Sequence, residues 1–99
     1  YLFQEPKNLP VLKVGEWHKA KIVVNGRRME HWLDGVLVME TDLESAALRA
    51  SMQAQPREDI PKPTRLDELK ANPTRKYPIV LTHHGGDAWF KNIRIRELR

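Results

Sequence analysis

Residues 16–40 read EWHKAKIVVNGRRMEHWLDGVLVME and decide the fold. Apolar and polar side chains alternate before Asn25-Gly26 and again between this dipeptide and Asp34-Gly35. Alternation with a period of two is typical of a strand with one buried face, and both dipeptides favour tight hairpin turns. The stretch therefore predicts an antiparallel meander of three strands. These strands span residues 16–24, 27–33 and 36–40.

The second predicted strand divides its side chains between two faces, with Met29, His31 and Leu33 on one and Arg28, Glu30 and Trp32 on the other. Successive side chains of a strand point to opposite faces of its sheet. His31 therefore shares a face with apolar neighbours. In that position a histidine is more often buried and hydrogen-bonded than catalytic.

The pattern changes after Glu40. Residues 41–44, Thr-Asp-Leu-Glu, have the spacing of a capping box, in which Thr41 accepts from the amide of Glu44 and the carboxylate of Glu44 reaches back. Alanines at positions 46, 47, 50 and 54 favour a helix over about residues 42–53. Pro56 ends this helix, which is inserted after the meander.

Residues 56–78 hold five of the seven prolines and predict a long loop with one helical turn at residues 66–70. Such a connection is often functional or mobile, and a loosely ordered surface excursion explains it equally well. Alternation returns over residues 78–98 around Gly85-Gly86 and predicts a second hairpin. The apolar positions of this alternation shift by one residue between Phe90 and Ile93, which indicates a bulge near Asn92.

Composition limits the chain to one small domain of 99 residues, 40% hydrophobic and 30% charged, and it contains no cysteine. Disulfides, thiolate zinc sites and a cysteine nucleophile are excluded. The apolar runs are far shorter than the roughly 20 residues of a membrane-spanning helix, so no membrane span is expected. The net charge of +4 would suit nucleic-acid binding. The cations alternate with acids and apolar residues, however, and we expect a mixed-charge surface and no nucleic-acid partner.

Four segments of the chain resemble the 3-keto-disaccharide hydrolase family. They are residues 16–18, 30–36, 79–85 and 88–98, and the closing run FKNIRIREL at 90–98 is the most specific. The chain departs from the family pattern at Asp34, at Lys91 and at Thr82-His83, where the family usually has Asn, Arg and Gln-Asp. The resemblance implies a mainly β fold, an antiparallel concanavalin A-like jelly-roll sandwich.

The resemblance covers the C-terminal half of that sandwich. Residues 1–99 are therefore expected to form the C-terminal part of a single domain, with the meander at 16–40, the helix and loop insertion at 41–77 and the hairpin at 78–98. The missing N-terminal half would come from a longer chain or from a partner chain. The family also implies a periplasmic or secreted protein, whose signal peptide would lie upstream of Tyr1.

The function implied by the resemblance is cleavage of 3-keto-glycosides. A ketone at C3 acidifies the hydrogen on C2, so a general base can start an elimination that is followed by hydration. His84 or His31 is the expected base and Lys91 the expected partner of the enolate. Trp32 would be a platform for the sugar ring. Glu30 and His83 would add further substrate contacts.

The sequence leaves several alternative roles open for these residues and for the domain. His83 and His84 would point to opposite faces of a continuous strand, and His18 is most simply a surface residue. Adjacent histidines cannot chelate one ion without a turn, so these residues predict no metal site and no cofactor, although the missing half could bring a divalent metal. The tryptophans fit a sandwich core as well as a sugar site. A non-catalytic carbohydrate-binding or interaction module is the second functional reading.

Overall fold

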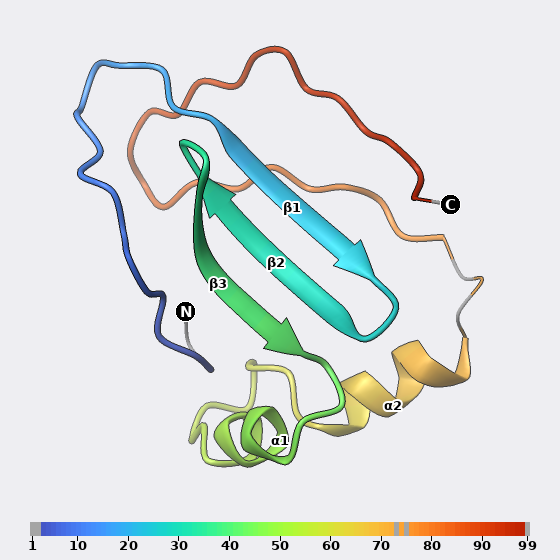
Figure 1. The fold of residues 1–99 in the computed structure, drawn as a ribbon. Helices are drawn as coiled ribbons and strands as arrows, with labels where there is room; N and C mark the ends of the chain where they lie inside the picture. Colours follow the sequence, from blue (N-terminus) through green and yellow to red (C-terminus); the bar gives the residue numbers. More distant parts are fainter. Residues whose placement is uncertain (1–2, 73, 75, 99) are drawn as a thin grey trace.

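The computed structural model describes residues 3–72, 74 and 76–98 of the chain. Three consecutive strands form one antiparallel sheet in the order β1-β2-β3, and two helices follow (Figure 1). The elements are β1 (Ala20–Asn25), β2 (Arg28–Leu33), β3 (Val36–Asp42), α1 (Ala46–Gln53) and α2 (Thr64–Ala71). The predicted meander is confirmed, but its first strand begins at Ala20 and not at residue 16, because His18 and the Lys19 amide bond to the side chain of Asp34 ahead of the strand. The antiparallel sheet with its helical insertion is consistent with part of a β-sandwich.

Two tight turns join the three strands. Asn25 is the last residue of β1 and pairs with Arg28, so the first turn consists of Gly26 and Arg27 and not of the predicted Asn25-Gly26. Gly26 has a φ of 59°. Leu33 pairs with Val36 across the second turn, where the φ angles of Asp34 and Gly35 are 46° and 80°. Positive φ at both central positions is the conformation that Asp-Gly favours in a two-residue hairpin.

A β-bulge interrupts the pairing of β2 with β3. His31 pairs with Met39 and Trp32 pairs with Leu37, which leaves Val38 as the extra residue. The expected bulge near Asn92 does not form, because that residue, with a φ of 56°, lies outside any strand. A bulge allows consecutive side chains of a strand to depart from simple alternation. Val38 and Met39 are accordingly both buried.

The N-terminal segment runs beside the outer edge of β3 (Figure 1). The amide of Lys7 donates to the carbonyl of Val38 over 2.6 Å, and Nε2 of Gln4 donates to the carbonyl of Glu40 over 2.7 Å. Oγ1 of Thr41 donates to Oε1 of Gln4 over 2.7 Å. These bonds occupy an edge that would otherwise be open to pairing with another strand.

The buried apolar side chains come from β3, from α1 and from the loop that follows α1. Its buried apolar side chains are Val38, Met39, Leu48, Met52 and Ile60. The hydroxyl of Ser51 on α1 donates to the carbonyl of Phe3 over 2.7 Å, which ties the helix to the N-terminal segment. The apolar face of β1 is less well covered. Ile22 and Val24 are 64% and 54% exposed there.

Helix α1 begins later than the capping box predicted. Oγ of Ser45 accepts from the amide of Leu48 over 3.1 Å, so Ser45 is the N-cap. Thr41 remains in β3, where it pairs with Met29 on β2, and its hydroxyl bonds to the N-terminal segment. The predicted start at residue 42 and the predicted capping box are therefore wrong, because the sheet holds Thr41. The predicted end at Gln53 is confirmed.

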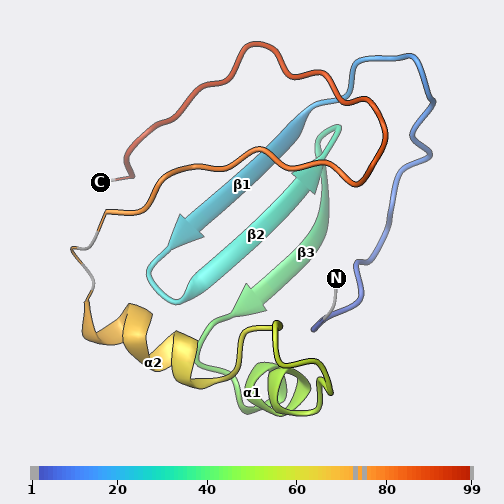
Figure 2. The ribbon, with the colours of Figure 1, turned by 180° about the vertical axis from the view of Figure 1, so that it is seen from behind.

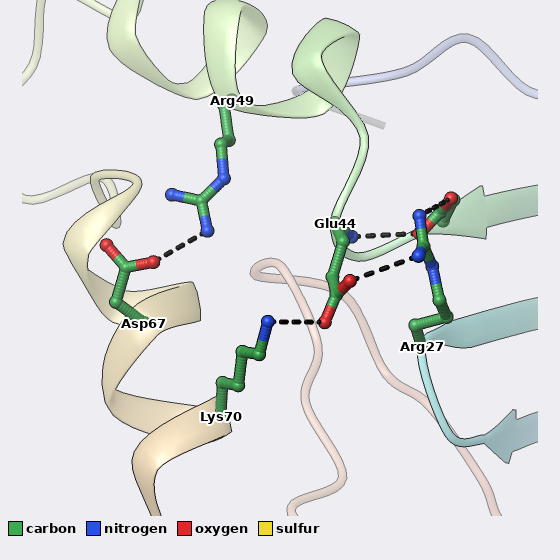
Figure 3. Close-up of polar contacts among 6 residues, drawn as sticks. Arg27, Glu44, Arg49, Asp67 and Lys70 are labelled. Carbon is green, nitrogen blue, oxygen red and sulfur yellow. Dashed lines mark hydrogen bonds and ion pairs between the residues drawn. The ribbon is translucent and has the colours of Figure 1, made fainter.

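The turn expected at residues 66–70 forms part of α2, and ion pairs connect this helix to the rest of the chain (Figure 3). Glu44 lies between two cations: its carboxylate is 3.1 Å from Nη1 of Arg27 and 3.0 Å from Nζ of Lys70. Nη2 of Arg49 lies 2.6 Å from Oδ1 of Asp67. Glu44 therefore links the first hairpin turn to α2, and Arg49 links α1 to α2.

The C-terminal segment doubles back at Gly85 and Gly86, but its described residues contain no strand (Figure 2). The hairpin predicted over 78–98 is thus present only as two extended arms. All described residues from 76 to 98 are exposed, including Ile79 at 69% and Ile95 at 82%. A two-stranded ribbon with nothing to pack against is marginal in water, which explains why alternation alone does not produce strands here.

Neither helix within the described residues has the length and apolar character that crossing a bilayer requires.

Replacing Leu48 by Ala should lower the free energy of unfolding by about 2–4 kcal/mol, because the side chain is 8% exposed in the core. The matched control is Leu9→Ala, since Leu9 is 55% exposed and its truncation leaves no cavity. Urea denaturation of both variants measures the difference. Equal destabilisation by the two substitutions would contradict the core described above.

Replacing Glu44 by Gln should loosen α2, because it removes the anion that both Arg27 and Lys70 contact. Hydrogen exchange of amides in α2 should become faster than in the parent protein. Glu68→Gln is the control, since Glu68 pairs with Arg65 within the same helix. If the two variants exchange alike throughout α2, the link through Glu44 does not hold the helix.

Candidate functional site

Trp32 lies on the polar face of β2 beneath a lysine from β1. Lys21 pairs with Trp32 in the sheet register, and its Nζ lies 4.4 Å from the centre of the indole ring. A cation over an aromatic face is attracted by the ring quadrupole. One face of the indole is therefore occupied by the ammonium group, and a sugar ring would stack there only if Lys21 moved aside.

The indole nitrogen of Trp32 is buried and has no hydrogen-bond partner among the described residues. The neighbouring Glu30 shares its face, and the carboxylate of Glu30, whose side chain is 16% exposed, lies 3.0 Å from Nη2 of Arg28. Arg28 also contacts Glu40 across the sheet at 3.1 Å. This face combines an aromatic ring with fixed charges, which are groups that can contact sugar rings and hydroxyls, whereas the buried N–H of the indole is not accessible to a ligand.

His31 lies on the opposite face of β2 from Glu30 and Trp32. It pairs with Ile22 on β1 and with Met39 on β3, and its side chain is half-buried. The prediction that His31 shares a face with apolar neighbours is confirmed. A single substrate on either face of the sheet therefore cannot contact both His31 and Trp32 within the strand.

The two adjacent histidines lie on the exposed C-terminal segment. Nδ1 of His83 is 2.9 Å from the carbonyl of Gly86. Because a carbonyl only accepts, Nδ1 carries the hydrogen of this bond, and Nε2 is the ring nitrogen left for another contact. His84 is exposed beside it. Within the described residues, no hydrogen bond or ion pair joins either of them to His31.

Lys91 contacts the entry to β1 rather than the face that carries Trp32. Its Nζ lies 4.1 Å from the centre of the Trp17 ring, and Trp17 is 57% exposed. This contact attaches the second C-terminal arm to the segment that leads into the sheet. The structure thus places the predicted residues in separate groups, with Glu30 and Trp32 together on β2 and Lys91 on Trp17.

A pair that the sequence interpretation missed is formed by His18 and Asp34. Nδ1 of His18 lies 2.7 Å from Oδ2 of Asp34, and Nε2 lies 3.0 Å from the carbonyl of Lys13. The amide of Lys19 donates to Oδ1 of Asp34 over 2.8 Å. The sequence could have predicted this pair, because the Asp34-Gly35 hairpin turn brings position 34 back beside the residues that precede β1.

Hydrogen bonds shift the pKa values of both members of this pair. The pKa of His18 is raised, mainly by the Lys13 carbonyl and then by the carboxylate of Asp34. The pKa of Asp34 is lowered, mainly by the Lys19 amide and then by the imidazole of His18. The contacts therefore favour a protonated imidazole beside an ionised carboxylate.

No group of three or more His, Asp or Glu side chains is placed to hold a metal ion within residues 3–72, 74 and 76–98.

One protein family matches nearly the whole chain. The sequence model of the family described as 3-keto-alpha-glucoside-1,2-lyase-like domain matches residues 1–96, which confirms the family resemblance seen in the sequence. No curated protein and no solved structure gives a significant match.

Replacing Lys21 by Ala should make the Trp32 indole more accessible, since the cation over one ring face is removed. Acrylamide quenching of Trp32 fluorescence, measured with Trp17 and Trp89 both replaced by Phe, should become more efficient. Lys7→Ala in the same background is the control. Unchanged quenching in Lys21→Ala would contradict the stacked geometry.

Proposed function

Because the chain belongs to the 3-keto-alpha-glucoside-1,2-lyase-like family, we propose that it forms part of an enzyme that cleaves 3-keto-glycosides. The single observation that carries this proposal is the family match over residues 1–96. It also supports a carbohydrate as the ligand of the chain. An exported protein, periplasmic or secreted, is part of the same proposal.

The proposed reaction is an elimination followed by hydration. A base removes the hydrogen from C2, which the neighbouring C3 ketone makes acidic, and the electron pair passes through the enolate. The bond between C1 and the glycosidic oxygen then breaks, and this oxygen leaves with a proton. Water adds across the resulting C1–C2 double bond and completes the net hydrolysis. An electrophilic group near the C3 oxygen would lower the barrier by stabilising the enolate.

His84 is the proposed base, and His31 is the alternative. The exposed imidazole of His84 is accessible to a substrate, which supports its assignment. His31 is half-buried between its neighbours in the sheet, so a substrate would need to approach the apolar face. His83 is proposed as a substrate contact through Nε2, since Nδ1 bonds to the backbone.

Lys91 and Trp32 are proposed to bind different parts of the substrate. The cation of Lys91 would stabilise the enolate oxygen, and its position over Trp17 gives it a defined location. Trp32 would stack against a sugar ring after Lys21 is displaced, with Glu30 as a neighbouring hydrogen-bond acceptor. Trp17, which is 57% exposed, adds another aromatic ring on the Lys91 side.

We also propose that further strands of the sandwich cover the apolar side chains left exposed on β1 and on the C-terminal arms. Ile22, Val80 and Ile95 are 64%, 69% and 82% exposed, which is unusual for side chains of this kind. The covering strands would come from a longer chain or from a partner chain. They would also supply surfaces that complete a substrate cleft.

Replacing the catalytic base by Gln should lower kcat/KM for a 3-keto-disaccharide by about 10²-fold or more, because a general base contributes at least that much. His84→Gln and His31→Gln are compared in the intact protein, with Lys91→Ala tested beside its control Lys76→Ala. Added imidazole should restore part of the lost rate only in the variant that lacks the base. A substrate carrying deuterium at C2 should react more slowly.

Unchanged rates in both histidine variants would remove these residues from the mechanism. Saturable sugar binding without any turnover would instead favour a non-catalytic carbohydrate-binding module. The exposed rings of Trp17 and Trp89, 57% and 72% exposed, favour this second candidate, since such rings can bind sugars without catalysis.

A further inference from the structure

We propose that His18 and Asp34 form a pH-dependent latch that holds the loop at residues 13–18 against the turn between β2 and β3. The latch concerns the attachment of this loop and does not depend on the proposed function. Both side chains are partly exposed, His18 at 23% and Asp34 at 35%, so protons from solvent can exchange with them.

The two contacts of the His18 ring require a proton on each nitrogen. Nδ1 faces a carboxylate oxygen at 2.7 Å and Nε2 faces the carbonyl of Lys13 at 3.0 Å. Neither partner can donate a hydrogen bond, and neutral imidazole has a single N–H. Loss of one proton therefore leaves a ring lone pair opposite an oxygen lone pair, whichever tautomer forms. The closed geometry is specific for the imidazolium.

The Asp34 side of the latch is fixed by the sheet. Its backbone is held in the tight turn, where its φ is 46°, and its amide donates to the carbonyl of Lys19 over 2.8 Å. Its second carboxylate oxygen accepts from the Lys19 amide. The loop side has fewer constraints, because residues 13–17 are exposed and their described backbone bond joins Glu16 to Lys13. Opening therefore moves the loop and leaves the turn in place.

The anions that face His18 favour its charged form, and the cations that face Asp34 favour the ionised carboxylate. The Lys13 carbonyl raises the pKa of His18 most, and the anions Asp34 and Glu16 raise it further. The cations of His18 and Lys19 lower the pKa of Asp34. From the C-terminal arm, Lys91 is the cation next to this loop, where it lies over Trp17.

The direction of the pH effect follows from these shifts. The pKa of His18 is raised from 6.5, so its stabilising contribution is complete below about that pH and is lost as the pH rises through the higher folded-state value. The pKa of Asp34 is lowered, so its contribution is lost only under acid, as the pH falls through its own reduced value. The latch is closed at pH values between the folded-state pKa of Asp34 and that of His18, and it opens when the pH rises above the pKa of His18.

Opening of the latch would weaken a contact with the C-terminal arm. Trp17 precedes His18 directly and supports the ammonium group of Lys91 at 4.1 Å. When His18 is released, the backbone at Trp17 loses its nearest anchor to the turn. The position of Lys91 should therefore become less defined at alkaline pH.

The test is an NMR titration of the intact protein, in which His18→Gln identifies the His18 ring signals. Asp34→Asn is the matched variant, because asparagine tolerates a positive φ and its oxygen still accepts from the Lys19 amide. We expect His18 to titrate above pH 6.5 in the parent and at a clearly lower pH in Asp34→Asn.

A second measurement follows opening itself. Exchange protection of the Glu16 amide, which donates to the Lys13 carbonyl within the loop, should fall in the parent as the pH rises through the His18 titration, beyond the ordinary alkaline acceleration of exchange. In His18→Gln no such step should remain. A His18 titration at or below pH 6.5, an equal titration in Asp34→Asn, or the same protection step in His18→Gln would each overturn the latch.

Discussion

The register of the β-meander is the constraint on which the other contacts depend. Each connection between its strands has two residues, so no strand can slide without rebuilding a turn. At one end of the sheet, this register places Arg27 beside Asp42, where the ion pairs to the helices begin. At the other end it places Asp34 beside Lys19 and His18. The two ends of one small sheet therefore position the helical insertion and the histidine pair.

Local signals predicted the elements that depend on neighbouring residues. The alternation around Asn25-Gly26 and Asp34-Gly35 predicted all three strands, because a hairpin needs only its turn and its adjacent partner. The alternation over residues 78–98 is similar in kind, but its arms lack a layer to pack against, and no strands form there. Alternation predicts a strand only where another surface buries one of its faces.

The helix start and the candidate site depended on longer-range contacts. Thr41 has good capping chemistry, but Gln4, far away in the sequence, takes its hydroxyl, and Ser45 caps the helix instead. The two faces of β2 were predictable, since alternation alone separates His31 from Trp32. The placement of Lys91 over Trp17 was not, because no local pattern connects the C-terminal arm with the entry to β1.

The bulge at Val38 also affects how the sequence of this chain can diverge. In a regular strand, burial falls on every second position, and the intervening positions accept polar residues freely. Here Val38 and Met39 are consecutive and both buried, at 1% and 9% exposure. A polar side chain at either position would be buried without a hydrogen-bond partner, so two adjacent positions must remain apolar, whereas an ordinary strand would require only one of them to be apolar. Homologous chains that share the bulge should therefore carry an apolar pair at this point of the strand.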